Sequence, residues 1–185
     1  MIRWRSPVPD TEVVAGVRYA DGPSAEAVIF IAATPQRVWE FVSDIGVPAR
    51  FSDELCAVEW AGETTRPCVG ARFIGRNRHP AIGSWETTSV VAECEPGRCF
   101  AWNVETPGGI SASWRFELEA DGEGTRLRQW GRMGPAPSGL TIAIEAMPDK
   151  EDRIIARRLA EWQRNIRANL EGIKALAERP AEQAR

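Results

Sequence analysis

The chain ends in residues 149–178, DKEDRIIARRLAEWQRNIRANLEGIKALAE. Apolar side chains recur there every three or four residues, at Ile155, Leu159, Trp162, Ile166, Leu170, Ile173 and Leu176. This spacing predicts an amphipathic helix with one apolar and one charged face. At about 1.5 Å per residue the helix would be about 45 Å long, which is enough to cross a whole β-sheet.

The segment before this helix is typical of a series of β-hairpins. Stretches rich in β-formers are separated by turn sequences such as Pro96-Gly97 and 121–124, DGEG. The last strands alternate clearly: Trp114, Phe116 and Leu118 are separated by charged residues. The predicted strands cover residues 55–60, 71–78, 85–94, 99–105, 110–119 and 125–133.

One further strand is predicted earlier in the chain, at residues 26–32, and two short helices follow it. Thr34-Pro35 suits a helix start, because threonine caps the first turn and proline is favoured there. A second short helical piece is expected around residues 48–52. We expect a loosely structured N-terminal arm over residues 1–24, a single ligand-binding domain over 25–178, and a disordered tail over 179–185.

This order of elements predicts a curved sheet with an internal cavity. A sheet face built mostly from consecutive strands has only the C-terminal helix to pack against, so the sheet has to curl around it. Eight tryptophans against a single tyrosine could provide wide apolar walls for the space that curling leaves. The fold class is therefore α+β, and the sequence indicates a container more clearly than a reaction.

Composition narrows the class of protein. The chain has 185 residues, of which 43% are hydrophobic and 26% charged, as expected for one globular domain. The absence of a long apolar run or a signal-peptide core favours the cytoplasm and argues against stable membrane insertion. The net charge of −3 argues against a nucleic-acid partner. Cys56, Cys68, Cys94 and Cys99 form no C-x-x-C pair and one histidine accompanies them, so we expect free thiols, no metal and no cofactor.

Four motifs give the chain a resemblance to a known superfamily. They are VIFIAATPQRVWEFVSDI (28–45), WETTSVV (85–91), PGRCFAW (96–102) and GEGTRL (122–127). On these motifs residues 25–178 resemble the START-like, helix-grip (SRPBCC) superfamily, and within it the bacterial polyketide cyclase/dehydrase-like lipid-transport group. The resemblance implies a seven-stranded antiparallel sheet gripping the C-terminal helix around a deep cavity. It also implies binding of lipids, sterols, polyketides or plant hormones, and in a minority of members cyclisation or aromatisation.

Strand alternation then predicts which side chains face the cavity. For each aromatic residue the simpler alternative is ordinary core packing. For the polar residues the alternative is hydrogen bonding to one another or to the backbone, since buried polar groups need partners. Phe41 and Phe51 are expected to close the entrance. The predicted ligand-binding residues are Phe73, Asn77, Trp85, Thr87, Ser89, Phe100, Trp102, Trp114, Phe116, Gln129, Trp162 and Ile166.

Catalytic candidates are few. Asn77, His79 and Arg76 could stabilise an enolate or relay a proton, although a histidine in a hairpin turn is usually only a solvated polar residue. Glu86 is expected to face outward, because its neighbour Trp85 competes for the interior. The alternating arginines of two strands are typical of the solvated face of a sheet, and the alternative is a basic patch for phosphate or acidic lipid. These six arginines are Arg72, Arg76, Arg78, Arg126, Arg128 and Arg132.

The sequence therefore favours binding or transfer of a hydrophobic small molecule, such as a lipid, a polyketide or a polycyclic compound. The second hypothesis is a cyclase or aromatase that folds a poly-β-ketone in the same cavity, since holding a reactive conformer needs few catalytic groups. A third is an interaction module in which the N-terminal arm and the long helix contact a partner protein. Homodimerisation through an edge strand is a further option.

Overall fold

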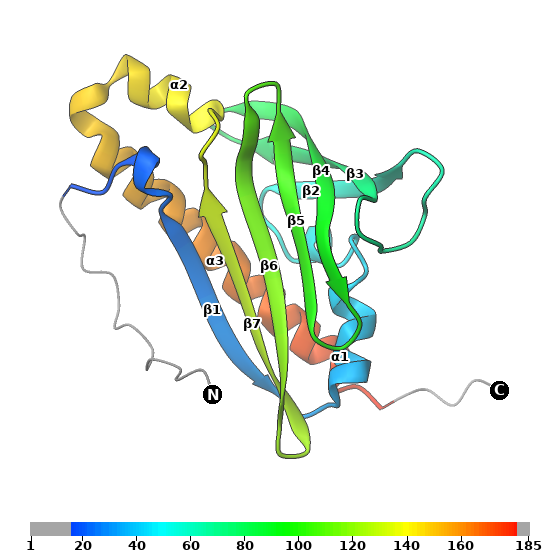
Figure 1. Ribbon diagram of the computed structural model, residues 1–185. Coiled ribbons are helices and arrows are strands. Elements are labelled where there is room, and N and C mark those ends of the chain that lie inside the picture. Colours follow the sequence, from blue (N-terminus) through cyan, green and yellow to red (C-terminus); the bar gives the residue numbers. More distant parts are fainter. Residues whose placement is uncertain (1–15, 181–185) are drawn as a thin grey trace.

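The computed structural model describes residues 16–180, and its centre is one seven-stranded antiparallel sheet (Figure 1). The strands run in the order β1-β7-β6-β5-β4-β3-β2, so each strand from β2 to β6 pairs with the next in the chain. The first strand joins the far edge beside β7. The strands are β1 (Ser24–Ile31), β2 (Leu55–Ala61), β3 (Arg72–His79), β4 (Gly83–Glu95), β5 (Cys99–Thr106), β6 (Gly109–Asp121) and β7 (Gly124–Met133).

A long helix, α3 (Glu151–Ala177), crosses one face of the curved sheet (Figure 1). Two shorter helices, α1 (Pro35–Val42) and α2 (Gly139–Ala146), lie near its two ends. Short 3₁₀ turns occupy Tyr19–Asp21, Pro48–Arg50 and Pro148–Lys150. The predicted α+β fold, with a curved seven-stranded sheet around a C-terminal helix, is confirmed. Of the two short helices expected after the first strand, the second is a single 3₁₀ turn.

Local sequence explains where the short helices begin. The Thr34 hydroxyl accepts a hydrogen bond from the Arg37 amide at 3.3 Å, and Pro35 occupies the first turn of α1. Ser138 caps α2 in the same way, accepting from the Leu140 amide at 3.2 Å. The apolar run that α2 contains was not assigned to an element from the sequence, because eight residues are too few to show a period.

Residues 16–23 pack onto the domain and do not form a loose arm. Tyr19 is buried, and its hydroxyl donates a hydrogen bond to the Ala136 carbonyl at 2.8 Å. Its backbone amide donates to Glu151 at the start of α3, also at 2.8 Å. The rest of the predicted arm, residues 1–15, and residues 181–185 of the predicted tail lie outside the described residues.

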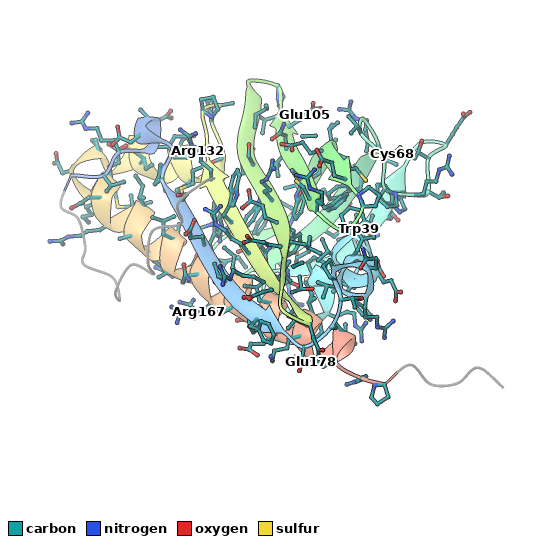
Figure 2. All side chains as sticks on the ribbon, turned by 60° about the horizontal axis from the view of Figure 1, so that its bottom comes forward. Trp39, Cys68, Glu105, Arg132, Arg167 and Glu178 are labelled. Atoms are coloured by element: carbon teal, nitrogen blue, oxygen red, sulfur yellow. The ribbon has the colours of Figure 1, made fainter. Side chains whose placement is uncertain are left out.

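Side chains of α3 occupy the free edge of β1. Gln163 and Lys174 donate to the carbonyls of Glu26 and Phe30 at 2.8 and 2.7 Å. The Ala32 amide, just beyond the strand, donates to the Glu178 carboxylate at 2.7 Å, close to the end of α3 (Figure 2). These contacts cover backbone groups that an edge strand would otherwise offer to a second chain. The expected homodimer through an edge strand stays a prediction, and β2 is the other edge of the sheet.

The face of the sheet turned away from α3 carries the alternating arginines, and acidic partners balance them. Arg76 pairs with Glu59 and Glu86, and Arg126 pairs with Asp121 at 2.9 Å. Arg72 and Arg128 pair with Glu105 and Glu26 in the same way. The prediction of a solvated face is confirmed. Glu86 is exposed and pairs with Arg76 as expected of an outward residue, although it also borders the cavity described below.

The four cysteines are free thiols. Cys68 is exposed in the loop between β2 and β3 (Figure 2). Cys99 is buried, and burial raises the pKa of its thiol to about 12. Within residues 16–180, no three His, Cys, Asp or Glu side chains gather so that they could hold a metal ion. Over the same residues no helix is long and apolar enough to cross a membrane.

Candidate ligand-binding cavity

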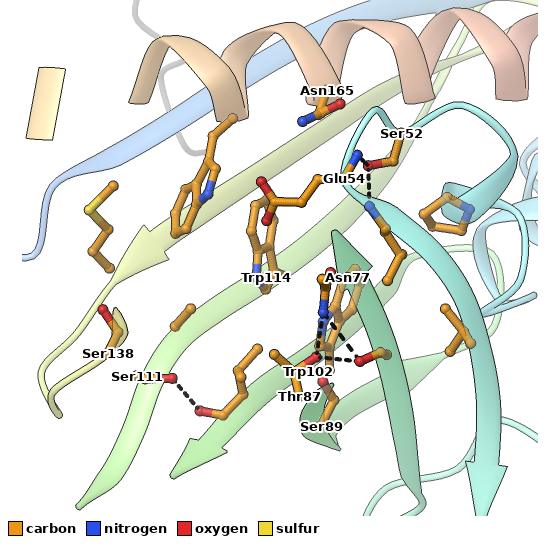
Figure 3. Close-up of a pocket in the computed structure, with 18 of the residues that line it drawn as sticks. Ser52, Glu54, Asn77, Thr87, Ser89, Trp102, Ser111, Trp114, Ser138 and Asn165 are labelled. Atoms are coloured by element: carbon orange, nitrogen blue, oxygen red, sulfur yellow. Dashed lines mark hydrogen bonds between the residues drawn. The ribbon is translucent and has the colours of Figure 1, made fainter. Parts of the chain in front are cut away.

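A cavity of about 640 Å³ lies between the sheet and α3 (Figure 3). Strands β2 to β7 provide most of its wall, and α2, α3, Tyr19 and the segment from Val42 to Glu54 contribute the remainder. The volume lies within the range of small-molecule sites in proteins, about 300–1,000 Å³. The space that the curled sheet was expected to leave is therefore present.

Every residue predicted to bind ligand lies on the wall of this cavity. Strand alternation placed them correctly because most register irregularities fall outside this set. One bulge lies between Val91 and Glu93, past the cavity-facing part of β4. That these residues contact a ligand stays a prediction. On the wall are Phe73, Asn77, Trp85, Thr87, Ser89, Phe100, Trp102, Trp114, Phe116, Gln129, Trp162 and Ile166.

Aromatic rings form a continuous band from the sheet to the helix. Trp102 on β5 stacks on Trp114 of β6, with ring centroids 6.4 Å apart and planes 15° apart. Trp114 in turn meets Trp162 of α3 at 4.5 Å. Phe100 and Phe116 flank Trp102 at 5.7 and 5.9 Å. These contacts fix the rings against one another, so the band offers a preformed apolar surface to a flat ligand.

Two polar residues on the wall hydrogen-bond within the protein (Figure 3). The Asn77 amide donates to the Gly75 carbonyl at 3.2 Å and to the Thr87 hydroxyl at 3.3 Å. The Thr87 hydroxyl donates to the same carbonyl at 3.3 Å. A side chain at Gly75 would come within 2.9 Å of that hydroxyl, so glycine leaves room for this arrangement. The alternative that these groups bond to one another and to the backbone holds for Asn77 and Thr87.

A second polar group, the amide pair, consists of Gln129 on β7 and Asn169 on α3. The Asn169 side-chain nitrogen donates to the Gln129 carbonyl oxygen at 2.9 Å. Gln129 is 5% exposed and Asn169 3% exposed, and both line the cavity. Among residues 16–180, nothing hydrogen-bonds to the carbonyl oxygen of Asn169. The amide pair is thus buried and incompletely satisfied.

A third group, the ion-pair cluster, consists of Glu54, Arg158 and Glu161. The Arg158 guanidinium donates to both oxygens of Glu54, at 2.5 and 2.6 Å, and to Glu161 at 3.2 Å. All three side chains are largely buried, with 14–16% exposed. Glu54 and Arg158 line the cavity, and the Arg158 guanidinium also lies 5.8 Å from the Trp162 ring. One guanidinium is thus shared by two carboxylates at the wall, and the exposed Arg157 adds a contact to Glu161 at 3.3 Å.

The ion-pair cluster keeps its charges through mutual stabilisation. Burial alone would raise the pKa of Glu161, but the hydrogen bond and charge of Arg158 outweigh burial and hold that pKa below its ordinary value. Burial would likewise lower the pKa of Arg158, and its hydrogen bonds and attraction to Glu54 and Glu161 raise it instead. Arg158 and Glu161 therefore both remain ionised at neutral pH.

The structure separates the three catalytic candidates. Asn77 lies on the cavity wall. Arg76 points away from it, as strand alternation requires of a neighbour of Asn77, and pairs with Glu59 and Glu86 on the outer face. His79 is neither on the wall nor freely solvated: its side chain is 17% exposed, and its Nε2 lies 3.6 Å from Glu161.

The two aromatic residues expected at the entrance do not border the cavity. The Phe51 ring packs where a side chain on Gly172 of α3 would otherwise lie. The Arg37 guanidinium covers Phe41 at 4.6 Å. Both rings pack on the helical side of the fold, so the prediction that they close the entrance is wrong.

Sequence reasoning missed several residues of the wall, including Glu54, Arg158, Asn169 and the α2 residues Leu140 and Ala143. For two of them the signal was present. Arg158 and Asn169 follow Ile155 and Ile166 by three residues, so both fall within the apolar stripe of α3. A polar residue inside an apolar stripe is a candidate for a buried polar site. Glu54 precedes a strand and carries no comparable signal.

Comparisons with known proteins agree with this architecture. The family model described as polyketide cyclase / dehydrase and lipid transport matches residues 22–178. A solution structure of a polyketide-cyclase-like protein from Corynebacterium glutamicum is 32% identical, covers 84% of this chain and 89% of that chain, and has a TM-score of 0.56. Comparison with curated proteins gave no match.

Two more distant structures share the fold. The di-domain ARO/CYC StfQ of the steffimycin biosynthetic pathway is 19% identical, with a TM-score of 0.63 over 84% of this chain and 50% of that chain. A protein from Thermus thermophilus is 18% identical, with a TM-score of 0.53 over 84% of this chain and 97% of that chain. The match to the family model spans the whole sheet, the cavity and α3, and the chain belongs to the polyketide cyclase / dehydrase and lipid transport family.

Proposed function

We propose that the protein binds or transfers a hydrophobic small molecule, such as a lipid, a polyketide or a polycyclic compound, inside the cavity between the sheet and α3. The observation that carries this proposal is the cavity of about 640 Å³ with its stacked aromatic band. Membership of a family described by both cyclisation and lipid transport supports a hydrophobic ligand of this kind.

The driving force for binding would be burial of apolar ligand surface. At about 25 cal/mol per Å², a ligand that buries about 300 Å² gains about 7.5 kcal/mol, before the loss of its own freedom of motion is subtracted. Because the aromatic rings already contact one another, little conformational entropy of the protein would be lost when a ligand binds. The few polar groups on the wall would then select the orientation of the ligand.

A blocking substitution tests this proposal. Ala112 lies on the cavity wall and is buried, so Ala112→Phe should fill part of the space. Ala120 is exposed on the same strand and away from the wall, which makes Ala120→Phe a matched control. Binding would be followed by quenching of tryptophan fluorescence and by thermal shift, over a panel of fatty acids, sterols and aromatic polyketides.

We expect at least one class in the panel to bind the wild-type protein and the Ala120→Phe variant, with affinity reduced about tenfold or more in Ala112→Phe. Native mass spectrometry of freshly purified protein should show a co-purified small molecule. Absence of both quenching and thermal shift across the panel would reject the proposal, and equal affinity in the two variants would move the site elsewhere.

The second candidate function is a cyclase or aromatase acting on a poly-β-ketone. The observation favouring it is the aromatic cavity, in a chain whose family is described by polyketide cyclisation as well as lipid transport. Confinement of a flexible chain in a reactive shape supplies much of the rate of such a reaction. The test is turnover of a poly-β-ketone thioester to an aromatic product, followed by absorbance. Turnover unchanged in Asn77→Leu would remove Asn77 from the mechanism.

A further inference from the structure

We propose that Cys68 and Cys94 are a pair of thiols that hydrogen peroxide converts into a disulfide, which fastens the loop between β2 and β3 to the end of β4. Cys68 is exposed in that loop (Figure 2), and Cys94 is partly buried near the end of β4. Neither residue lines the cavity, so this modification site does not depend on the proposed ligand.

A contact through Pro67 holds the two cysteines close together. The Cys94 thiol donates a hydrogen bond to the Pro67 carbonyl oxygen, with sulfur and oxygen 3.6 Å apart. Pro67 and Cys68 share a trans peptide bond, in which that oxygen lies about 2.8 Å from the following Cα. The Cys94 sulfur is therefore no more than about 6.4 Å from the Cα of Cys68. Because Cys68 is in an exposed loop, rotation of its side chain and a shift of about 2 Å bring the two sulfurs to bonding distance.

Backbone hydrogen bonds fix this part of the loop against β4. The Ala71 amide donates to the Cys68 carbonyl at 3.0 Å, which closes a turn where Gly70 has a φ of 84°. The Gly70 amide donates to the Val91 carbonyl at 2.8 Å, and the Val91 amide donates to the Ala71 carbonyl at 2.9 Å. The turn is thus attached to β4 shortly before Cys94. Little freedom of the loop has to be lost when the disulfide forms.

The other two cysteines are badly placed to react with Cys94. In the register of β4 and β5, Cys94 lies opposite Phe100 and Glu95 lies opposite Cys99. Alternation therefore directs the Cys94 and Cys99 side chains to opposite faces of the sheet, and Cys99 is also buried. Cys56 is exposed, but it lies beside the end of β3 that is remote from the loop. Of the cysteines in the chain, Cys68 is the one that Cys94 can reach.

The two positions suit the two steps of thiol oxidation. The Cys68 sulfur, as a thiolate, attacks one oxygen of hydrogen peroxide. The O–O bond breaks, Cys68 becomes a sulfenic acid, and the released hydroxide takes up a proton to form water. The Cys94 sulfur then attacks the Cys68 sulfur, so that the S–S bond forms, the S–O bond breaks, and the oxygen leaves as water with the Cys94 proton. In total the two thiols lose two electrons and two protons, and the peroxide is reduced to water.

The environment of each thiol assigns the order of these steps. Burial raises the pKa of the Cys94 thiol, and the nearby Cys68 thiol adds a smaller effect in the same direction. A thiol with a raised pKa is a poor first target for a peroxide, since the thiolate is the reactive form. Cys68 is exposed and meets the peroxide first, and Cys94 reacts with it from the adjacent strand.

The disulfide closes a covalent ring over residues 68–94, which include β3 and most of β4. A crosslink of this kind stabilises a fold mainly by restricting the unfolded chain. Both strands carry residues of the cavity wall, among them Phe73 and Thr87. Oxidation is therefore expected to make this part of the wall harder to unfold, and the midpoint of urea unfolding should rise.

Peptide mapping of the full chain after treatment with hydrogen peroxide tests the site. The free thiols should fall from four to two, the mass of the monomer should fall by two hydrogen atoms, and dithiothreitol should reverse both changes. Trypsin does not cut between Arg66 and Pro67, so residues 51–72 should be recovered linked to residues 79–98. The Cys56→Ser variant is the matched control, because residues 51–72 also contain Cys56, and it should give the same link.

The two reacting positions are tested by Cys68→Ser and Cys94→Ser, in which the link should be absent and oxidation should leave the urea midpoint unchanged. A link to any other peptide, a disulfide between two chains, or loss of thiols without a link overturns the proposed site. A link in the wild-type protein with an unchanged urea midpoint overturns the fastening of the loop. If Cys94→Ser fails to fold, Cys68→Ser at the exposed position provides the comparison.

Discussion

The two polar groups that α3 brings to the cavity differ in how completely they are satisfied. Arg158 and Asn169 are eleven residues apart in the same apolar stripe, or about 16 Å along the helix. Arg158 belongs to the ion-pair cluster, where it donates to both Glu54 and Glu161. Asn169 belongs to the amide pair, where its oxygen has no partner among the described residues.

This difference predicts how much each group contributes to the stability of the fold. The ion-pair cluster joins α3 to the residue preceding β2, and its buried charges satisfy one another. Buried charges that are paired hold elements in register, and they have little left to offer a ligand. The amide pair also joins α3 to the sheet, but the Asn169 oxygen has no partner among the described residues. Substitutions in both groups should therefore reduce stability, and the loss should be larger in the first group.

The largest effect is expected from Arg158→Met, which leaves Glu54 buried and unpaired and leaves Glu161 only its contacts with Arg157 and His79. Loss of one partner from a buried ion pair costs about 3–5 kcal/mol of folding free energy. Urea unfolding followed by tryptophan fluorescence measures it. The control is Arg167→Met on the same helix, whose exposed side chain makes no ion pair with the described residues and should tolerate the change. Equal stability of the two variants would contradict the role assigned to the ion-pair cluster.

A smaller effect is expected from the amide pair. Asn169→Leu removes an unsatisfied group but leaves the Gln129 oxygen unpaired, so we expect a loss of about 1–2 kcal/mol. Replacing both residues with leucine removes both polar groups, and the double variant should recover most of that loss. Urea unfolding of the two variants provides the comparison. A double variant that is less stable than the single one would show that the pair holds the fold, as the ion-pair cluster does.

The contrast also shows what could be predicted from the sequence. The aromatic wall was predictable, because alternation in β6 places Trp114 and Phe116 on one face, and antiparallel pairing carries that parity to β5 and β7. Gln129 was found by the same rule. Its partner Asn169 was not predicted, because the helical pattern was defined by apolar residues and Asn169 is a polar residue within that stripe.

Other parts of the site depend on tertiary contacts that no local pattern encodes. Glu54 precedes β2, and its position on the wall depends on a helix residue about a hundred positions later in the chain. His79 looked like a solvated turn residue, but the same helix covers it through Glu161. Tyr19 fell in a segment rich in proline and glycine and is buried by the loop after β7. Such pairings are fixed by how the long helix crosses the sheet.

Acidification should weaken the ion-pair cluster and leave the amide pair unchanged. The pKa of Glu161 in the folded protein lies below its ordinary value of 4.5, because Arg158 outweighs the effect of burial. A lowered pKa means that the charged form stabilises the fold fully above about pH 4.5, and that this stability is lost as the pH falls through the folded pKa. Unfolding measured between pH 7 and pH 3 should show the decline.

The Glu161→Gln variant should show a shallower decline over this pH range. Glu171→Gln is the control on the same helix, where the side chain is exposed. Its decline should match that of the wild-type protein. A decline of equal steepness in Glu161→Gln would place the acid-sensitive group outside the ion-pair cluster.

The smallest effect is expected from Arg76→Ala. Arg76, like Arg158, pairs with two glutamates, but it does so on the exposed face of the sheet. Arg76 pairs with Glu59 and Glu86, yet its side chain is 53% exposed. Water replaces an exposed ion pair at little cost, so the melting temperature should stay within experimental error of the wild type. Binding of a cavity ligand should be unchanged too, since Arg76 lies on the outer face. A loss of binding or turnover in this variant would show that the outer face takes part in function, and would return Arg76 to the catalytic candidates.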